Sequence, residues 1–326
     1  MSNECVEVVL PGVVEPEGLQ VNRKELPVPG PGQVRVRVEA TGVSFAEQQM
    51  RRGRYYDQPP FPFVPGYDLV GVVETTGRRV AALTKVGAWA SHVVLDEADL
   101  VDVPEGVDPI EAETVVVNGI TAWQMLHRAA KAKQGQTILV HGANGGVGSV
   151  LTRLAKAEGI HVIGTASPRH HEAIRKLGVT PIDYRDDVPR KVRELAPEGV
   201  DAVFDHIGGR SVVDSWRLLR KGGALVAYGS AATKEDTGAK ALPVLKIVAR
   251  TLLWNALPNG RTATFYNIWA KKFKAKHNED LKAVLARLAS GHIDATVAEV
   301  FPLEQAAAAL RLAEERTTAG KIVLKP

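Results

Sequence analysis

The segment His141-Gly142-Ala143-Asn144-Gly145-Gly146-Val147-Gly148 follows the apolar run 137–140 and precedes residues 149–156, whose apolar side chains have helical spacing. The order is strand, glycine-rich turn and helix. Glycines let main-chain N–H groups approach a pyrophosphate, and the N-terminus of the following helix adds partial positive charge. The segment therefore predicts a dinucleotide-binding turn. A purely structural turn between a strand and a helix is the alternative.

The residues after this turn complete a strand–helix–strand unit. Gly159 ends the helix and residues 161–166 form a second strand, so the unit has the length of a mononucleotide-binding half, roughly thirty residues. Strands and helices go on alternating, with strands expected at 182–184, 200–205 and 224–229 and helices at 172–177 and 212–219. This alternation predicts a parallel sheet that binds its ligand at the carboxyl ends of its strands.

The N-terminal part of the chain has a different pattern. Val34, Val36 and Val38 alternate with polar residues, as in a half-buried strand. Further short strands are expected within 64–73, 79–83 and 90–95, which together predict a small β-barrel. From about residue 111 the pattern becomes helical, and this change marks a domain junction. The C-terminal part predicts helices at 281–288 and 303–314 and a last strand at 321–324.

Composition narrows the class of protein. The chain has 326 residues, of which 45% are apolar and 24% charged, as expected of a globular protein with two domains. Cys5 is the single cysteine, which excludes a disulfide scaffold and a cysteine-rich zinc lobe. No apolar run approaches the roughly 18 residues of a membrane span, and we expect a cytoplasmic protein. The net charge of +4 is too small to indicate nucleic-acid binding, and the lysines of 271–276 are typical of a solvated helix face.

The second strand of the unit carries information about the cofactor. Sites for NAD usually place Asp or Glu at the end of this strand, where it binds the ribose hydroxyls. Here Thr165-Ala166-Ser167 stands at that place, and no carboxylate follows before Glu172. Arg169, His170 and His171 are suited to a 2′-phosphate, so the sequence favours NADPH. The alternative is that these basic residues form a solvated turn without a specific role.

Three motifs together resemble a zinc-independent medium-chain dehydrogenase/reductase of the quinone oxidoreductase type, and the resemblance covers nearly the whole chain. They are 142–148, 118–126 (Asn-Gly-Ile-Thr-Ala-Trp-Gln-Met-Leu) and 65–71 (Pro-Gly-Tyr-Asp-Leu-Val-Gly). The resemblance implies an α/β fold, in which a Rossmann doubly wound parallel sheet is inserted in a GroES-like β-rich catalytic domain. The domains it implies are residues 1–118 plus 261–326 and, between them, the NADPH-binding residues 119–260, with the active site in the cleft.

The zinc alcohol dehydrogenases of the same superfamily have a Cys where Ser44 stands and Gly-His-Glu where Gly66-Tyr67-Asp68 stands. Both ligand positions are therefore replaced, and the scattered His92 and His127 do not supply the three protein donors that zinc needs. We expect no metal. The remaining chemistry is hydride delivery to a carbon that is already electrophilic, in a quinone or in the C=C bond of an enone.

Catalytic roles are expected for Tyr55, Tyr67 and Ser44. A tyrosine hydroxyl can donate a hydrogen bond to a developing oxyanion, although packing of both rings against the pocket is an equally open interpretation. The resemblance places Ser44 near the nicotinamide. The predicted cofactor-binding residues are Thr121, Gly142, Ala143, Asn144, Gly145, Gly146, Val147, Gly148, Ser167, Arg169, His171, Tyr184, Tyr228, Gly229, Ser230, Phe265, Arg316 and Lys321.

The sequence thus predicts an NADPH-dependent reductase of quinones or α,β-unsaturated carbonyl compounds, assembled as a homodimer as relatives of this family often are. Two other classes stay open: a non-catalytic NADPH-binding protein with a structural or RNA-binding role, and a metal-dependent alcohol dehydrogenase. The chain departs from the family at Ser44 and Gln49, where many quinone oxidoreductases have Asn and Tyr. It is also shorter than the family around residues 74–80, as if a hairpin were missing.

Overall fold

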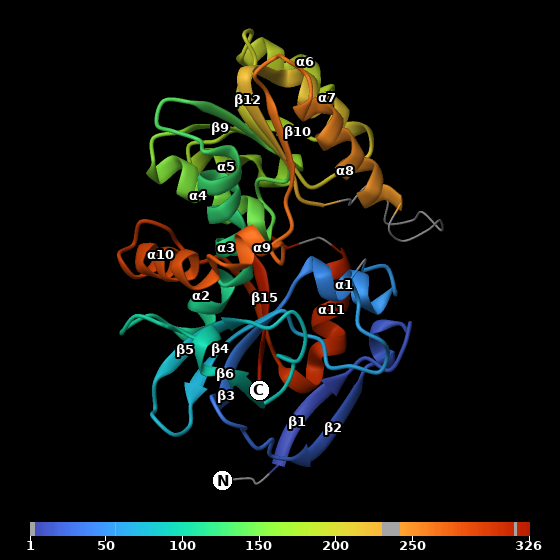
Figure 1. Ribbon diagram of the computed structural model, residues 1–326, viewed down its shortest axis with the longest axis vertical. Coiled ribbons are helices and arrows are strands. Elements are labelled where there is room, and N and C mark those ends of the chain that lie inside the picture. Colours follow the sequence, from blue (N-terminus) through green and yellow to red (C-terminus); the bar gives the residue numbers. More distant parts are fainter. Residues whose placement is uncertain (1–3, 56, 230–241, 316–317) are drawn as a thin grey trace. The chain divides into compact units, whose positions relative to one another are not determined.

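The computed structural model describes residues 4–55, 57–229, 242–315 and 318–326. The chain forms two compact units, which we call the terminal unit (Met1–Ile120 with His277–Pro326) and the central unit (Thr121–Lys276). Figure 1 shows the N-terminal chain in blue and the C-terminal chain in red within the terminal unit. The fold class expected from the sequence is confirmed, because one unit is a parallel α/β sheet and the other is rich in antiparallel strands.

The central unit contains a six-stranded sheet in the order β10-β9-β8-β11-β12-β13, and every neighbouring pair in it is parallel. Its strands are β8 (Thr137–Val140), β9 (His161–Ala166), β10 (Thr180–Asp183), β11 (Val200–Asp205), β12 (Leu219–Ala227) and β13 (Thr262–Phe265). The strand order runs outward from β8 in both directions, as in a doubly wound nucleotide-binding sheet. All carboxyl ends therefore lie along one edge.

Helices cover both faces of this sheet, and Figure 1 shows α4 and α5 on one face and α7 and α8 on the other. The described helices are α4 (Gly146–Ala157), α5 (His171–Lys176), α6 (Val188–Leu195), α7 (Arg210–Leu218), α8 (Leu242–Asn255) and α9 (Lys271–Lys274), while α3 (Val117–Trp123) continues into a π-helical turn at Gln124–Ala130. The core combines β-branched residues of the strands, such as Val203, with Trp216 of α7 and Ile247 of α8. Strands buried on both faces explain the continuous apolar runs in the sequence.

The second junction between the units differs from the expected one. We predicted it after residue 260, but the central unit extends to Lys276. The reason is β13, because Thr262–Phe265 pairs with β12 in parallel register and completes the sheet. β13 is as short as β8, but β8 has the apolar sequence Thr-Ile-Leu-Val, whereas β13 has the sequence Thr-Ala-Thr-Phe and no apolar run that would indicate a buried strand.

The terminal unit has a seven-stranded sheet in the order β14-β15-β3-β4-β5-β7, with β6 also paired to β3, and a separate two-stranded sheet β1-β2. The strands are β1 (Glu4–Val9), β2 (Gln20–Glu25), β3 (Gln33–Val43), β4 (Asp68–Val73), β5 (Arg79–Leu83), β6 (His92–Asp96), β7 (Val101–Asp102), β14 (Val297–Pro302) and β15 (Lys321–Lys325). β4 and β5 are joined directly by a tight turn, in which the Gly77 N–H donates to Val73 O (2.8 Å). This direct connection accounts for the short stretch around residues 74–80.

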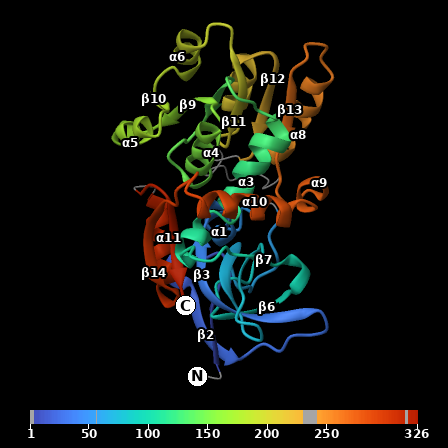
Figure 2. The ribbon, with the colours of Figure 1, turned by 90° about the vertical axis from the view of Figure 1, so that its left-hand side faces the viewer.

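Short helices complete the terminal unit: α1 (Phe45–Arg51), α2 (Pro109–Thr114), α10 (His277–Ala289) and α11 (Ala306–Glu315). Helix α11 packs against β14, β15 and β3 (Figure 2). Its Leu310 is buried in a cluster with Trp89 and Ile322, which joins elements from both ends of the chain. No described helix in either unit is both long enough and apolar enough to span a membrane.

A buried ionic cluster ties three elements of the terminal unit together. The Lys321 ammonium of β15 lies 2.5 Å from Asp68 Oδ2 of β4 and 2.6 Å from Glu113 Oε1 of α2, and all three side chains are at most 2% exposed. Gly42 of β3 makes room for the cluster, because a Cβ there would lie 2.1 Å from Lys321 Cε. Asp68 also accepts a hydrogen bond from the Val117 N–H (2.9 Å).

The charges of this cluster balance when one carboxyl keeps its proton. Burial raises the pKa of Glu113 well above its usual range and favours the neutral acid. Burial also disfavours the Lys321 ammonium, but the neighbouring Asp68 and Glu113 outweigh this effect, so the pKa of Lys321 is raised. The cluster therefore consists of an ammonium–carboxylate pair, Lys321 with Asp68, beside a carboxylic acid.

Replacing Lys321 by Met should lower the free energy of unfolding by about 3–5 kcal/mol at pH 7, because the buried Asp68 carboxylate loses its cation. Urea unfolding at pH 7 measures this. Lys325→Met, which changes an exposed lysine at the end of the same strand, is the control, and an equal loss there would contradict the prediction.

Candidate functional site

The glycine-rich turn between β8 and α4 has no room for side chains at two positions. Gly142 adopts a φ of +67°, and a Cβ on it would lie 2.6 Å from the His206 ring. A Cβ on Gly148 would lie only 2.1 Å from the Gly142 carbonyl oxygen. Helix α4 therefore begins directly against the end of β8. This is the close backbone approach that a pyrophosphate site at a helix N-terminus requires.

The turn is anchored to the second strand by two main-chain N–H groups that donate to Thr165. The Gly142 N–H donates to Thr165 Oγ1 (3.0 Å) and the Ala143 N–H donates to Thr165 O (2.9 Å). The Gly145 N–H donates to Gly142 O (2.9 Å) and closes the turn on itself. The position of the turn thus depends on Thr165 in β9, a residue that lies 23 positions after Gly142.

A buried polar network around Asp205 also supports the glycine-rich turn. Ser211 Oγ and Ser215 Oγ of α7 donate to Asp205 Oδ2 (2.7 and 2.8 Å), and the N–H groups of residues 207 and 208 donate to Asp205 Oδ1 (2.8 and 3.0 Å). Because Ser215 donates to Asp205, its oxygen accepts from His141 Nε2 (3.2 Å). Burial lowers the pKa of His141, so the ring is neutral and links Ser215 to Thr165. Sequence reasoning missed Asp205 and its partners.

The predicted adenosine-phosphate residues lie together at the carboxyl ends of β9 and β10. Ser167 follows directly after β9 and Tyr184 directly after β10. The Ala166 carbonyl oxygen lies 3.1 Å from His171 Nε2 and accepts from the Tyr184 N–H (3.4 Å), so both residues converge on one strand end. Arg169 is exposed beside them, and its Nε donates to His170 Nε2 (3.1 Å).

Two further strand ends contribute predicted residues. Tyr228 and Gly229 follow β12, and a Cβ on Gly229 would lie 2.7 Å from the His206 carbonyl oxygen. Phe265 ends β13 opposite Ala227. His206 packs against both Gly142 and Tyr228 and is a site residue that sequence reasoning missed. Predicted residues Ser230 and Arg316 lie outside the described residues.

Two further predicted cofactor residues, Lys321 and Thr121, do not follow strands of the central sheet. The Lys321 ammonium is enclosed by Asp68 and Glu113 within the terminal unit and is 2% exposed. Thr121 belongs to α3 and is 7% exposed.

The two predicted catalytic tyrosines are brought together in the terminal unit. Their hydroxyl oxygens lie 2.9 Å apart, and the rings meet edge to face with centroids 6.4 Å apart. Tyr67 is buried at 4% exposure and Tyr55 is half-buried. Tyr55 and Tyr67 lie twelve positions apart in the sequence, so only the fold could reveal that the two hydroxyls form a pair.

Ser44 is the N-cap of α1 and is engaged in a capping box. Its Oγ accepts from the Ala46 N–H (3.1 Å) and hydrogen-bonds Glu47 Oε2, while the Ser44 N–H donates to the same oxygen (2.8 Å). Glu47 is 1% exposed, and burial raises its pKa. Sequence reasoning missed Glu47, although Ser-x-x-Glu before a helix is the signature of a capping box.

The residues at the former zinc positions do not suit a metal. Ser44 is committed to Glu47, and the Tyr67 hydroxyl faces Tyr55. His92 lies 3.4 Å from Glu74, which also pairs with Arg35, and His127 lies 3.2 Å from Glu158. Among the described residues no three His, Cys, Asp or Glu side chains gather as a ligand set. The donor set therefore does not fit zinc.

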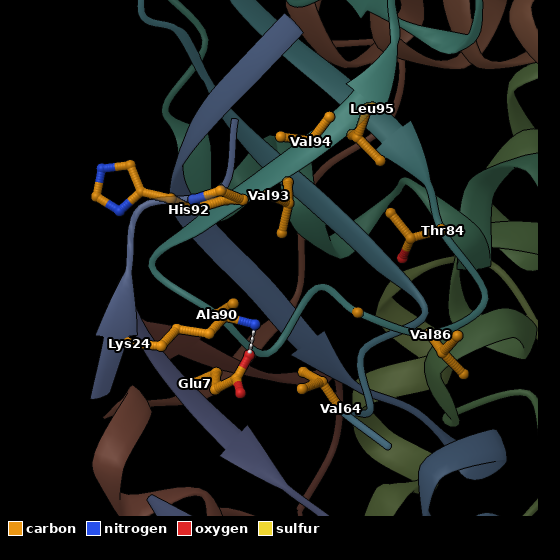
Figure 3. A pocket seen from close by; sticks show the side chains of 12 residues that line it. Glu7, Lys24, Val64, Thr84, Val86, Ala90, His92, Val93, Val94 and Leu95 are labelled. Carbon is orange, nitrogen blue, oxygen red and sulfur yellow. Dashed lines mark ion pairs between the residues drawn. The ribbon is translucent and has the colours of Figure 1, made fainter. Parts of the chain in front are cut away.

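A cavity of about 250 Å³ lies in the terminal unit between the β1-β2 hairpin and β6 (Figure 3). Apolar side chains such as Val64 and Val93 line it, and the Glu7–Lys24 ion pair (2.5 Å) spans one end. The His92 ring points away from it in Figure 3. No predicted site residue lines this cavity, so it is separate from the site described above.

Two family models match the chain. Residues 30–105 match the alcohol dehydrogenase GroES-like domain, and residues 177–324 match a model described as zinc-binding dehydrogenase. The first match lies within the terminal unit. The second covers part of the central unit and the C-terminal chain.

Characterised relatives resemble the chain over most of its length. The synaptic vesicle membrane protein VAT-1 homolog of Rattus norvegicus is 34% identical over 92% of this chain and 78% of its own. The 2-haloacrylate reductase of a Burkholderia species is 32% identical over 91% of this chain and 92% of its own. The quinone oxidoreductase of Thermus thermophilus, solved also with NADPH, superposes with a TM-score of 0.81 at 29% identity, over 98% of this chain and all of the other.

Replacing Gly148 by Ala should open the turn, because its Cβ would meet the Gly142 carbonyl oxygen at 2.1 Å. We expect a free energy of unfolding lower by about 1–3 kcal/mol and a nicotinamide dinucleotide affinity lower by at least about tenfold. Urea unfolding and nucleotide titration measure the two effects. Gly145→Ala is the comparison, since its Cβ would lie 3.3 Å from the same oxygen. Equal losses in both variants would contradict the assignment.

Proposed function

The chain belongs to the medium-chain dehydrogenase/reductase family, among its quinone oxidoreductase-like members, and from this premise we propose that it is an NADPH-dependent, zinc-independent reductase. Its substrates are quinones or compounds with a C=C bond conjugated to a carbonyl group. The observation that carries the proposal is the hydroxyl pair of Tyr55 and Tyr67. This hydroxyl pair would provide a proton donor, and its Tyr67 stands where the zinc-dependent relatives have a metal-binding histidine.

The cofactor assignment rests on the central unit. The glycine turn at 142–148 would hold the pyrophosphate through main-chain N–H groups, with the N-terminus of α4 adding positive charge. Ser167, Arg169, His171 and Tyr184 would hold the adenosine ribose and its 2′-phosphate, and Tyr228, Gly229 and Phe265 would line the rest of the cofactor. When bound, the reduced nicotinamide supplies a hydride. The named 2-haloacrylate reductase and the NADPH complex of the quinone oxidoreductase support this class of chemistry.

The tyrosine pair would complete the reduction. Addition of hydride to the β-carbon of an enone, or to a quinone, leaves negative charge on the carbonyl oxygen, and this oxyanion needs a hydrogen-bond donor. We assign that role to Tyr55, the more exposed of the two. When the Tyr55 proton is directed to the substrate, its oxygen would accept the hydrogen bond from Tyr67. That hydrogen bond stabilises the tyrosinate left behind when Tyr55 releases its proton, which solvent then replaces. Ser44, whose hydroxyl is held by Glu47 and the Ala46 N–H, would shape the substrate site by fixing the start of α1.

Purified protein should oxidise NADPH in the presence of an enone or quinone panel, measured as loss of the absorbance of the reduced nicotinamide. A comparison of the two panels separates enone from quinone reduction. Inactivity on every member, with NADPH binding retained, would contradict the enzyme and favour a non-catalytic NADPH-binding protein; salt-sensitive retention on RNA would then support an RNA-binding role. Stoichiometric zinc in the active protein would favour the metal-dependent alternative.

In the same assay, Tyr55→Phe should lower kcat by about 100-fold, since it removes the proton donor, while the dissociation constant for NADPH stays unchanged. Tyr67→Phe should have a smaller effect, about tenfold, because it removes only the supporting hydrogen bond. The double variant should be no worse than Tyr55→Phe alone. Losses that multiply in the double variant, or full activity in Tyr55→Phe, would show that the rings only pack.

We further propose a homodimer through the outer face of the central unit. Helix α8 presents Leu245, Leu252 and Leu253 to solvent at 59%, 67% and 65% exposure, beside the edge strand β13. Among the described residues β13 pairs only with β12, so its outer edge is open to the same strand of a second copy. An identical partner covers the open edge and the leucines at once.

Leu252→Glu combined with Leu253→Glu should convert the dimer to a monomer, because two charges would be buried at the contact. Sedimentation equilibrium measures the mass. Val28→Glu, which changes an 86% exposed residue of the terminal unit, should leave the dimer intact. A wild-type monomer at micromolar concentration would contradict the proposal.

A further inference from the structure

The second strand of the sheet, β9, ends without a carboxylate of its own. The neighbouring strand β10 nevertheless places one, that of Asp183, beside that end. Asp183, the last residue of β10, pairs in register with Ala166, the last residue of β9. Asp183 is therefore a neighbour of Ser167 in space and far from it in sequence. In dinucleotide sites a carboxylate at this edge binds the ribose hydroxyls and repels a 2′-phosphate. Its charge would oppose the NADPH preference that we infer from β9 alone.

Arg185 covers this carboxylate with a fork of hydrogen bonds. Its Nε lies 3.1 Å from both Asp183 oxygens, its Nη2 donates to Oδ2 (2.7 Å), and its main-chain N–H donates to Oδ1 (3.1 Å). The Asp183 side chain is 15% exposed under this cover, whereas the Arg185 side chain is 63% exposed. The hydrogen bonds from Arg185 lower the pKa of Asp183, so the carboxylate is ionised and the pair is a full ion pair.

The pair lies among the predicted phosphate residues. The Arg185 guanidinium carbon is 6.0 Å from the centre of the Tyr184 ring, and His171 is close enough to Asp183 to contribute to its lowered pKa. One guanidinium edge is used by Asp183, and a guanidinium has five N–H donors in a planar fork. The exposed part of Arg185 thus keeps donors that suit a phosphate next to Tyr184.

We propose that Arg185 is a specificity-determining residue for the cofactor, which acts by neutralising Asp183 and by presenting its own cation to the 2′-phosphate. With Arg185 in place the strand edge accepts NADPH. Without it, Asp183 becomes a bare carboxylate that repels the phosphate and accepts the hydroxyls of NADH. This inference rests on the proposed function, because it assumes that the site binds a nicotinamide dinucleotide.

Three variants separate the two effects of Arg185: Arg185→Ala, Asp183→Asn and the double variant. Dissociation constants for NADPH and NADH are measured by fluorescence titration at one fixed ionic strength. Arg185→Ala should weaken NADPH by about 30-fold and change NADH by less than about threefold. The double variant should bind NADPH at least about fivefold more tightly than Arg185→Ala, because the repelling carboxylate is gone.

A second arginine–aspartate pair, at the amino ends of the strands of the same sheet, offers a matched control. Arg220 pairs with Asp201 near the amino ends of β12 and β11, with exposures of 49% and 12% that resemble those of Arg185 and Asp183. Arg220→Ala removes one cation and uncovers one aspartate, as Arg185→Ala does, but far along the strands from the carboxyl edge. It should leave the ratio of the two dissociation constants unchanged within about twofold.

Equal weakening of NADPH and NADH in Arg185→Ala would overturn the inference, as would a double variant no better than Arg185→Ala. A wild-type protein that prefers NADH would overturn it too. These outcomes differ from failure of the proposed function. If Arg185 sets the NADPH preference but no quinone or enone is reduced, the inference stands and the reductase is contradicted; if wild-type protein binds neither nucleotide, both fail.

Discussion

The approach of the Gly148 α-carbon to the Gly142 carbonyl oxygen is the constraint on which the central unit depends. A Cβ at Gly148 would lie 2.1 Å from that oxygen, so only glycine lets α4 start against the end of β8. This tight turn directs the N-terminus of α4 toward the carboxyl edge of the sheet. The hydrogen bonds from the turn to Thr165 then fix β9 beside β8 and continue the parallel order outward.

Parallel order explains why residues far apart in sequence form one candidate site. Each strand of the sheet ends at the same edge, so the residues that follow β8, β9, β10, β12 and β13 become neighbours without any local signal. The edge is also charged by this arrangement, since it brings Asp183 beside Ala166. Arg185, two residues further on, compensates that charge. The net charge at the carboxyl ends of the strands therefore depends on residues from neighbouring strands and cannot be judged from one strand alone.

The terminal unit uses buried polar groups for two different purposes. Lys321, Asp68 and Glu113 hold β15, β4 and α2 in one place, and their side chains have almost no exposed surface. Tyr55 and Tyr67 instead pair their hydroxyls with one partner half-buried, which leaves chemistry open to a ligand.

The sequence by itself determined the order of elements, the glycine turn and the absence of a carboxylate from the second strand, because each depends on residues within a few positions of one another. It could not determine the junction at Lys276, the burial of Lys321, the support of the turn by Asp205, or the Asp183–Arg185 pair beside Ala166. Only the tertiary structure decided these. Sheet pairing and burial set the distance between residues that are remote in the chain, and charge and hydrogen bonding act over that distance.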